Sequence, residues 1–148
     1  MSGAVSRRGA FARMAAAATA LLGANRVTAA TASSPPRVAY HLSDLDKVAF
    51  VLGNIANHIA GENGNVEIVL VVHGPALMAF RANAADANVR QKLAGIAAQG
   101  VMLGACGNTL DAQQLTVADL LPGFARVDEG GVVRLARLQA EGYAYLRP

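Results

Sequence analysis

The sequence has 148 residues, of which 53% are hydrophobic and 16% charged, and its formal net charge is +3. This length suits a single domain, and the high apolar fraction excludes a disordered chain. The one cysteine excludes both a disulfide framework and a metal cluster built from cysteine alone.

Positive charge is concentrated at the N-terminus. Residues 1–32 contain four arginines and no acid, whereas the rest of the chain has nine Lys and Arg against ten acids. Residues 14–24 form an apolar run too short to span a membrane but long enough for the core of a signal peptide. The Ala30-Thr31-Ala32 segment offers a cleavage site, and Ser6-Arg7-Arg8 resembles a twin-arginine export motif.

We therefore predict a signal peptide over residues 1–32, a linker over 33–36 and a domain over 37–148, with export to the periplasm. Two alternatives remain for residues 1–32, namely a mitochondrial transit peptide and an Ala-rich helix retained in the mature protein. The basicity belongs to this leader, and the chain has no basic-aromatic patch. The sequence thus gives no support to nucleic-acid binding.

Strands and helices are expected to alternate along the rest of the chain. The strands are predicted at residues 38–42, 66–72, 101–105, 124–127 and 143–146. The first helix is predicted to start from a cap at Ser43 or Asp44, and the second stretch starts at Pro75 and has an apolar face of Val89, Leu93, Ile96 and Ala97. A Thr116–Asp119 capping box predicts a third, short helix, and the last helix is predicted over 132–141. This order predicts a small three-layer, flavodoxin-like α/β domain with a mostly parallel sheet.

Unusual residues fall where the predicted strands end. His41 and His73 end the first two strands, and Cys106 follows the third. The carboxyl ends of parallel strands share one edge of a sheet, which is where such folds bind ligands. Cys106 is the sharpest candidate, because backbone N–H groups after it and a helix beginning near Gln113 would stabilise a thiolate. The alternative is a buried, inert cysteine.

The two histidines also allow two interpretations. His73 would act as a base or thiolate partner for Cys106, or it would only hydrogen-bond the loop backbone. His41 is expected to contribute to substrate binding. A His/His/Cys metal site is not supported, because the sequence has no short spacing of ligands. Neither a nucleotide-binding glycine motif, a Gly-x-Ser-x-Gly motif nor a C-x-x-C pair is present.

From Arg37 to Pro148 the sequence resembles the DsrE/DsrF-like family, which includes the YchN-like proteins. The resemblance rests on residues 38–43, 69–75, 105–110 and 142–146, and on the Gly-Val-Val-Arg-Leu-Ala-Arg-Leu-Gln segment of the last predicted helix. It implies a compact α/β fold that assembles into trimers or hexamers. In the best understood members it implies sulfur transfer, with a persulfide on the cysteine that Cys106 matches.

The leading hypothesis is therefore an exported sulfur carrier or sulfurtransferase-like protein with Cys106 as nucleophile and His73 as the residue that tunes it. The other residues expected to bind substrate are His41, Gly74, Gly107, Asn108 and Thr109. No metal or organic cofactor is needed, and the expected partners are copies of the same chain and a thiol acceptor protein, without a membrane span in the mature chain. The alternative is a non-catalytic oligomeric protein that binds a small ligand and has a structural Cys106. A Cys-His hydrolase is a third reading, but no acid that would orient the histidine is apparent.

Overall fold

The computed structural model describes residues 34–148. The predicted signal peptide and the first linker residue lie outside this part of the chain. The strands are β1 (Arg37–Leu42), β2 (Glu67–Val72), β3 (Met102–Cys106), β4 (Phe124–Val127) and β5 (Ala144–Leu146). The α-helices are α1 (Val48–Gly61), α2 (Ala87–Ala98), α3 (Gly107–Ala112) and α4 (Gly131–Ala140), with 3₁₀ turns η1 (Leu45–Lys47), η2 (Gly74–Phe80) and η3 (Val117–Asp119).

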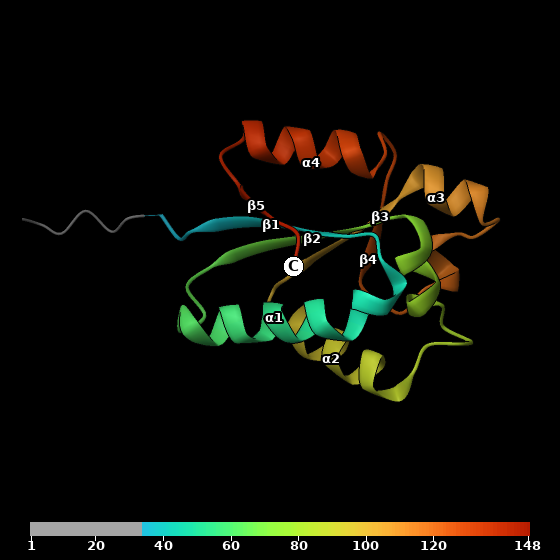
Figure 1. Cartoon of the computed structure of the whole chain (residues 1–148), viewed down its shortest axis with the longest axis horizontal. Helices are drawn as coiled ribbons and strands as arrows, with labels where there is room; N and C mark the ends of the chain where they lie inside the picture. The colour runs from blue at the N-terminus through green and yellow to red at the C-terminus, as the bar shows by residue number, and fades with distance from the viewer. Residues whose placement is uncertain (1–33) are drawn as a thin grey trace, which may run out of the picture. The chain divides into compact units, whose positions relative to one another are not determined.

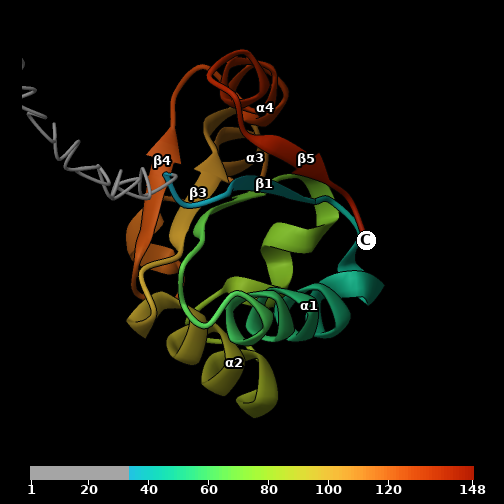
Figure 2. The ribbon, with the colours of Figure 1, turned by 90° about the vertical axis from the view of Figure 1, so that its left-hand side faces the viewer.

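The five strands form one parallel sheet in the order β4-β3-β2-β1-β5. The chain moves in one direction from β1 to β4 and then returns, so that β5 pairs with the other side of β1. Because crossovers are right-handed, a reversal of direction moves the connecting helix to the opposite face. Helices α1 and α2 therefore cover one face of the sheet and α4 covers the other (Figures 1 and 2). This confirms the predicted three-layer, flavodoxin-like α/β fold.

The two faces of the sheet carry separate cores. The larger core joins the sheet to α1 and α2, and it contains alternate residues of the central strands, such as Leu70 and Val72. The intervening residues of β1 and β2 pack against α4, in a smaller cluster made of Ala39, Val69, Val71, Leu135, Leu138 and Tyr143. Burial on both faces explains the nearly continuous apolar run of β2.

The predicted helices begin and end at somewhat different residues in the structure. The turn after β1 starts as η1, and α1 follows it without a side-chain cap from Ser43 or Asp44. The stretch after Pro75 is split into η2 and α2, and the Asp86 side chain accepts a hydrogen bond from the Asn88 N–H at the start of α2. The predicted Thr116–Asp119 capping box is present, but it opens only the short η3.

One helix start differs in a way that matters for the site. The sequence predicts a helix beginning near Gln113, whereas α3 begins at Gly107 and Gln113 follows its end. A Cβ atom at Gly107 would lie only 2.9 Å from the Val127 carbonyl oxygen. Because glycine has no Cβ atom, α3 can start immediately after β3 and close to β4. The composition of the loop did not indicate this start. Within residues 34–148, no helix is both long and apolar enough to cross a membrane.

Candidate functional site

The carboxyl edge of the sheet brings together three of the residues singled out from the sequence. His41 is the penultimate residue of β1, His73 directly follows β2, and Cys106 is the last residue of β3. The three strands are adjacent and parallel. Strand pairing thus places the three residues side by side, although His41 and His73 are 32 positions apart in the sequence and His73 and Cys106 are 33 positions apart.

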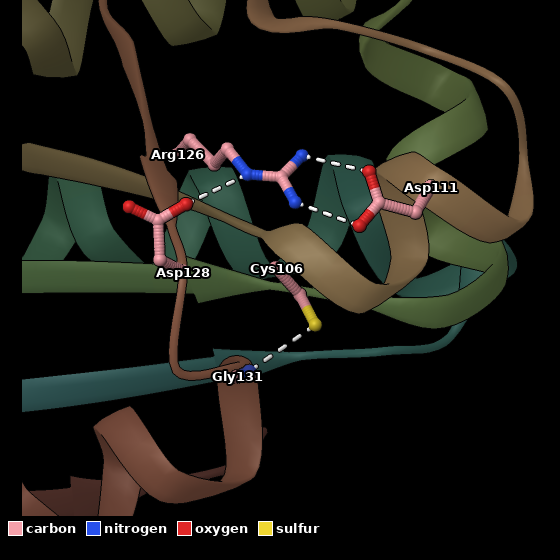
Figure 3. Close-up of polar contacts among 5 residues, drawn as sticks. All are labelled: Cys106, Asp111, Arg126, Asp128 and Gly131. Carbon is pink, nitrogen blue, oxygen red and sulfur yellow. Dashed lines mark hydrogen bonds and ion pairs between the residues drawn. The ribbon is translucent and has the colours of Figure 1, made fainter.

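Cys106 lies where two helices begin. It precedes the first residue of α3, and its Sγ accepts a hydrogen bond of 3.1 Å from the N–H of Gly131, the first residue of α4 (Figure 3). A Cβ atom at Gly131 would stand 3.3 Å from the Cβ of His73 and 3.4 Å from that of Cys106. The absence of a side chain therefore lets the N-terminus of α4 come close to the sulfur, and the positive end of a helix dipole stabilises a thiolate.

Burial and hydrogen bonding act in opposite directions on the thiol. Burial raises the pKa of Cys106, whereas hydrogen bonds from the Thr109 side chain and from the N–H groups of Gly131, Thr109 and Asn108 lower it. The lowering contributions are larger together, so the pKa of Cys106 lies below its ordinary value. The site thus favours the thiolate, which is the nucleophilic form of cysteine.

The Thr109 hydroxyl is oriented by the neighbouring loop. Its Oγ1 accepts a hydrogen bond of 3.0 Å from the Gly74 N–H, which leaves the hydroxyl proton to donate to Cys106. Gly74 has a φ of +59°, in the left-handed region that favours glycine. Gly74 therefore supports the thiol through Thr109, and it does not need to contact a substrate itself.

A pocket of about 250 Å³ opens beside the sulfur. It is lined by His73, Cys106, Asn108, Thr109, Glu129, Gly130, Gly131, Val132 and Val133. Cys106 is buried, with 5% of its surface exposed, while Val132 and Val133 on the rim are exposed. Three of the five predicted substrate-binding residues do not line this pocket, namely His41, Gly74 and Gly107.

His73 contacts His41 through its ring. The two Nε2 atoms are 2.5 Å apart, and Nδ1 of His41 lies 2.6 Å from the hydroxyl oxygen of Tyr145. Among the described residues, the hydrogen-bond partners of the Cys106 sulfur do not include His73. His73 therefore reaches the pocket as a wall residue whose Nε2 is engaged with another imidazole.

Arg126 forms an ion-pair network with two carboxylates near Cys106. The sequence did not indicate this network. Arg126 on β4 makes two hydrogen bonds with the Asp111 carboxylate on α3, of 3.0 and 2.7 Å, and one of 2.8 Å with Asp128 in the loop before α4 (Figure 3). Arg126 thus ties together the two segments whose N–H groups donate to the sulfur. A fork of this kind fixes geometry better than a single ion pair does.

The described part of the chain offers no obvious metal site. Within residues 34–148, no three His, Cys, Asp or Glu side chains cluster in a way that could hold an ion. The groups beside the Cys106 thiol in the pocket are an imidazole, a hydroxyl and backbone N–H groups.

Comparison with known proteins identifies the family of this chain. The model of the DsrE/DsrF-like family matches residues 9–148. The chain belongs to the DsrE/DsrF-like family. Comparison with functionally curated proteins gave no significant match.

Solved structures agree with the DsrE/DsrF-like fold. A protein of unknown function, MTH1491 from Methanobacterium thermoautotrophicum, is 32% identical, with a TM-score of 0.68 over 76% of this chain and 99% of that one. The ychN protein from E. coli is 18% identical, with a TM-score of 0.59 over 77% and 99% of the two chains. BT1422 from Bacteroides thetaiotaomicron, a conserved protein of unknown function, is 16% identical, with a TM-score of 0.54 over 76% and 94%. The last two similarities concern the fold alone.

Proposed function

We propose that this DsrE/DsrF-like protein is an exported, homo-oligomeric sulfur carrier that holds sulfane sulfur as a persulfide on Cys106. The observation that carries the proposal is the convergence of hydrogen-bond donors on one sulfur atom, namely N–H groups of α3 and α4 and the Thr109 hydroxyl of α3. Export rests on the composition of residues 1–32, and the oligomer and the acceptor protein rest on the family resemblance.

The chemistry requires only the thiolate and a donor. Cys106 attacks the outer sulfur of a donor of the R–S–SH type, a bond forms between Sγ and that sulfur, and the S–S bond of the donor breaks. The electron pair leaves with the donor thiolate, which takes a proton from water. The N–H groups around Sγ stabilise negative charge before and after the transfer. Neither a metal nor an external oxidant takes part in the step.

The burial of Cys106 favours a second candidate function. With 5% of its surface exposed, this cysteine also suits a structural role in a protein that binds a small ligand in the pocket without reacting with it. Thiol titration of the folded protein separates the two functions. A carrier has a thiol that is modified readily at neutral pH, whereas a structural cysteine stays unmodified until the protein unfolds.

Intact-mass measurement tests the carrier directly. The wild-type protein and Cys106→Ser are incubated with inorganic polysulfide and freed of reagent before measurement. We expect one added sulfur atom on the wild type and none on the variant. An unchanged mass of the wild type, or the same addition on both proteins, would contradict the proposed function.

A further inference from the structure

Four side chains form a row across neighbouring strands near the carboxyl edge of the sheet. Tyr145 on β5 pairs with Ala39, two residues before His41, and His41 pairs with Val71, two residues before His73. Residues two apart on a strand share a face. The β2–β3 register then places Cys106 next to His73. All four belong to the face of the sheet that α4 covers.

The first three members of this row are joined by close contacts. Nε2 of His41 lies 2.5 Å from Nε2 of His73, and the rings are stacked with centroids 4.7 Å apart. Nδ1 of His41 lies 2.6 Å from the Tyr145 hydroxyl oxygen. A neutral imidazole has one donor and one acceptor nitrogen, so the protons of these hydrogen bonds can be oriented in either direction. We refer to the three hydrogen-bonded side chains as the Tyr145–His41–His73 chain.

The two ends of the chain have different surroundings. Tyr145 is 40% exposed, whereas His41 is 9% exposed. His73 lines the pocket that contains Cys106. The chain therefore connects the pocket to the surface through a buried imidazole. We propose that it carries a proton from the pocket to solvent when sulfur leaves Cys106 for an acceptor thiol, an inference that rests on the proposed function.

Burial, assisted by the positive charge of Arg147, keeps both imidazoles neutral at neutral pH. Burial lowers the pKa of His41 to about 4, with further lowering by His73 and Arg147 against a smaller opposing effect of Asp44. Burial and Arg147 likewise lower the pKa of His73, again opposed by Asp44. Arg147 is itself paired with Asp44 at 3.3 Å. A neutral imidazole accepts a proton on one nitrogen and releases one from the other, so it passes protons on without storing charge.

Two further ionisable groups face the pocket end of the chain. One is Cys106, whose hydrogen bonds from Thr109 and from backbone N–H groups lower its pKa. Glu129 lines the pocket and is paired with Arg137 at 3.2 Å. Because that carboxylate is already paired with a cation, we assign the proton to His73, on Nδ1, the ring nitrogen that does not contact His41.

Sulfur leaves Cys106 in two stages, namely loss of a proton from the acceptor thiol and attack by the resulting thiolate. The acceptor R–SH gives its proton to His73, a proton moves from His73 to His41, and another passes through Tyr145 to water. The acceptor thiolate then attacks the outer sulfur of the Cys106 persulfide. The S–S bond to Cys106 breaks, its electron pair stays on Sγ as the thiolate, and the acceptor becomes R–S–SH.

The experiment separates loading of sulfur from its release. Wild type, Tyr145→Phe and His41→Gln are loaded with polysulfide and then discharged either to 2-mercaptoethanol or to sulfite, with intact mass followed over time. Sulfite attacks without losing a proton at alkaline pH. We expect both variants to load normally and to discharge normally to sulfite, but to release sulfur to the thiol about tenfold more slowly at neutral pH.

A matched control is provided by another tyrosine on the same face. The Tyr143 hydroxyl donates to Glu67, away from the chain, so Tyr143→Phe is expected to behave as the wild type in both assays. The slower release of sulfur to the thiol by Tyr145→Phe should disappear at pH values above the pKa of the acceptor thiol, because the acceptor has then already lost its proton.

Three results would overturn the inference. Thiol discharge of both variants at the wild-type rate across the pH range would show that the chain carries no proton. Equal slowing with thiol and sulfite would assign the effect to structural damage. Failure of the wild type to load at all would overturn the proposed function itself, and this outcome is recognised before any variant is discharged.

Discussion

At the scale of single residues, the lowered pKa of Cys106 depends on hydrogen-bond donors that lie far apart in the sequence. Thr109 is three residues away and Gly131 is twenty-five residues away, yet both donate to the same sulfur. The sequence predicted that N–H groups following Cys106 would stabilise a thiolate, and those of Asn108 and Thr109 do lower its pKa. The sequence located Cys106 and Thr109 at the end of a strand, but it did not indicate that the start of the last helix would point at the thiol.

Thr109→Val is expected to raise the pKa of Cys106. The substitution removes the hydroxyl that donates to the sulfur while keeping the shape of the side chain, so the thiolate loses one of its stabilising bonds. The rate of alkylation by iodoacetamide, followed against pH, should have its midpoint at higher pH in the variant. Thr116→Val is the control, because Thr116 caps η3 instead. Equal midpoints in Thr109→Val and the wild type would contradict the role of this hydroxyl.

The titration of His41 predicts how stability changes with pH. Its pKa is lowered from 6.5 to about 4 by burial first, then by His73 and Arg147. Between these two values the unfolded chain binds a proton that the folded protein does not, so stability is complete above pH 6.5 and falls towards pH 4. In urea unfolding, the midpoint of the wild type should fall more steeply across this window than that of His41→Gln. Parallel pH profiles of the two proteins would show that His41 is not buried in its neutral form.

At the scale of elements, the sequence predicted most of the fold because each element carries a local signal. The apolar spacing of Val48, Val51 and Ile55 identified α1, and all three are buried as expected. The β-branched run of β2 identified a central strand, and Phe124–Val127 is observed with the predicted bounds. Such patterns depend on residues that are neighbours in the chain, which is why they can be read without a structure.

Features that depend on distant residues were missed. Tyr145 lies on a three-residue strand, and its contact with His41 exists only because the chain reverses and β5 pairs with β1. The Arg126 network likewise joins β4, α3 and the loop before α4. The predicted helix near Gln113 was wrong, since the close contact that selects Gly107 involves a strand twenty residues further along.

The start of α3 provides a stability prediction with an internal control. In Gly107→Ala the new Cβ would lie 2.9 Å from the Val127 carbonyl oxygen, so α3 must move away from β4. We expect a loss of about 1–3 kcal/mol in the free energy of unfolding. Gly95→Ala, on α2, where the new Cβ would meet nothing within 4 Å beyond the backbone of its own helix, should instead gain up to about 1 kcal/mol. Urea denaturation of both variants checks the pair, and equal stabilities would contradict the tight contact at Gly107.

At the scale of the whole molecule, the two faces of the sheet are covered unequally. Helices α1 and α2 lie under the sheet, whereas α4 is the single α-helix packed over the middle of the opposite face in residues 34–148 (Figure 2). Beside α4 a hollow of about 410 Å³ lies over β2, β3 and β4, and its lining includes Val69, Met102 and Ala125. We expect copies of the chain to associate through this face, in keeping with the proposed homo-oligomer.

Met102→Asp tests that expectation. Met102 is 45% exposed and lies on the same face as Val69, so a carboxylate there should lower the sedimentation coefficient of the assembly without unfolding the protomer. Val117→Asp, at a similarly exposed apolar position on η3, should leave assembly unchanged. An unaltered assembly in Met102→Asp would place the interface elsewhere.

The proposed function requires that Cys106 bind a sulfur atom and transfer it to an acceptor thiol. The most direct measurement follows isotopically labelled sulfur from polysulfide to the protein and then, after removal of reagent, to glutathione. We expect the label to become attached to Cys106 and then to appear on glutathione as the hydropersulfide, while the protein returns to its original mass. Label that never attaches to Cys106, or that stays there in the presence of the thiol, would contradict the proposed function.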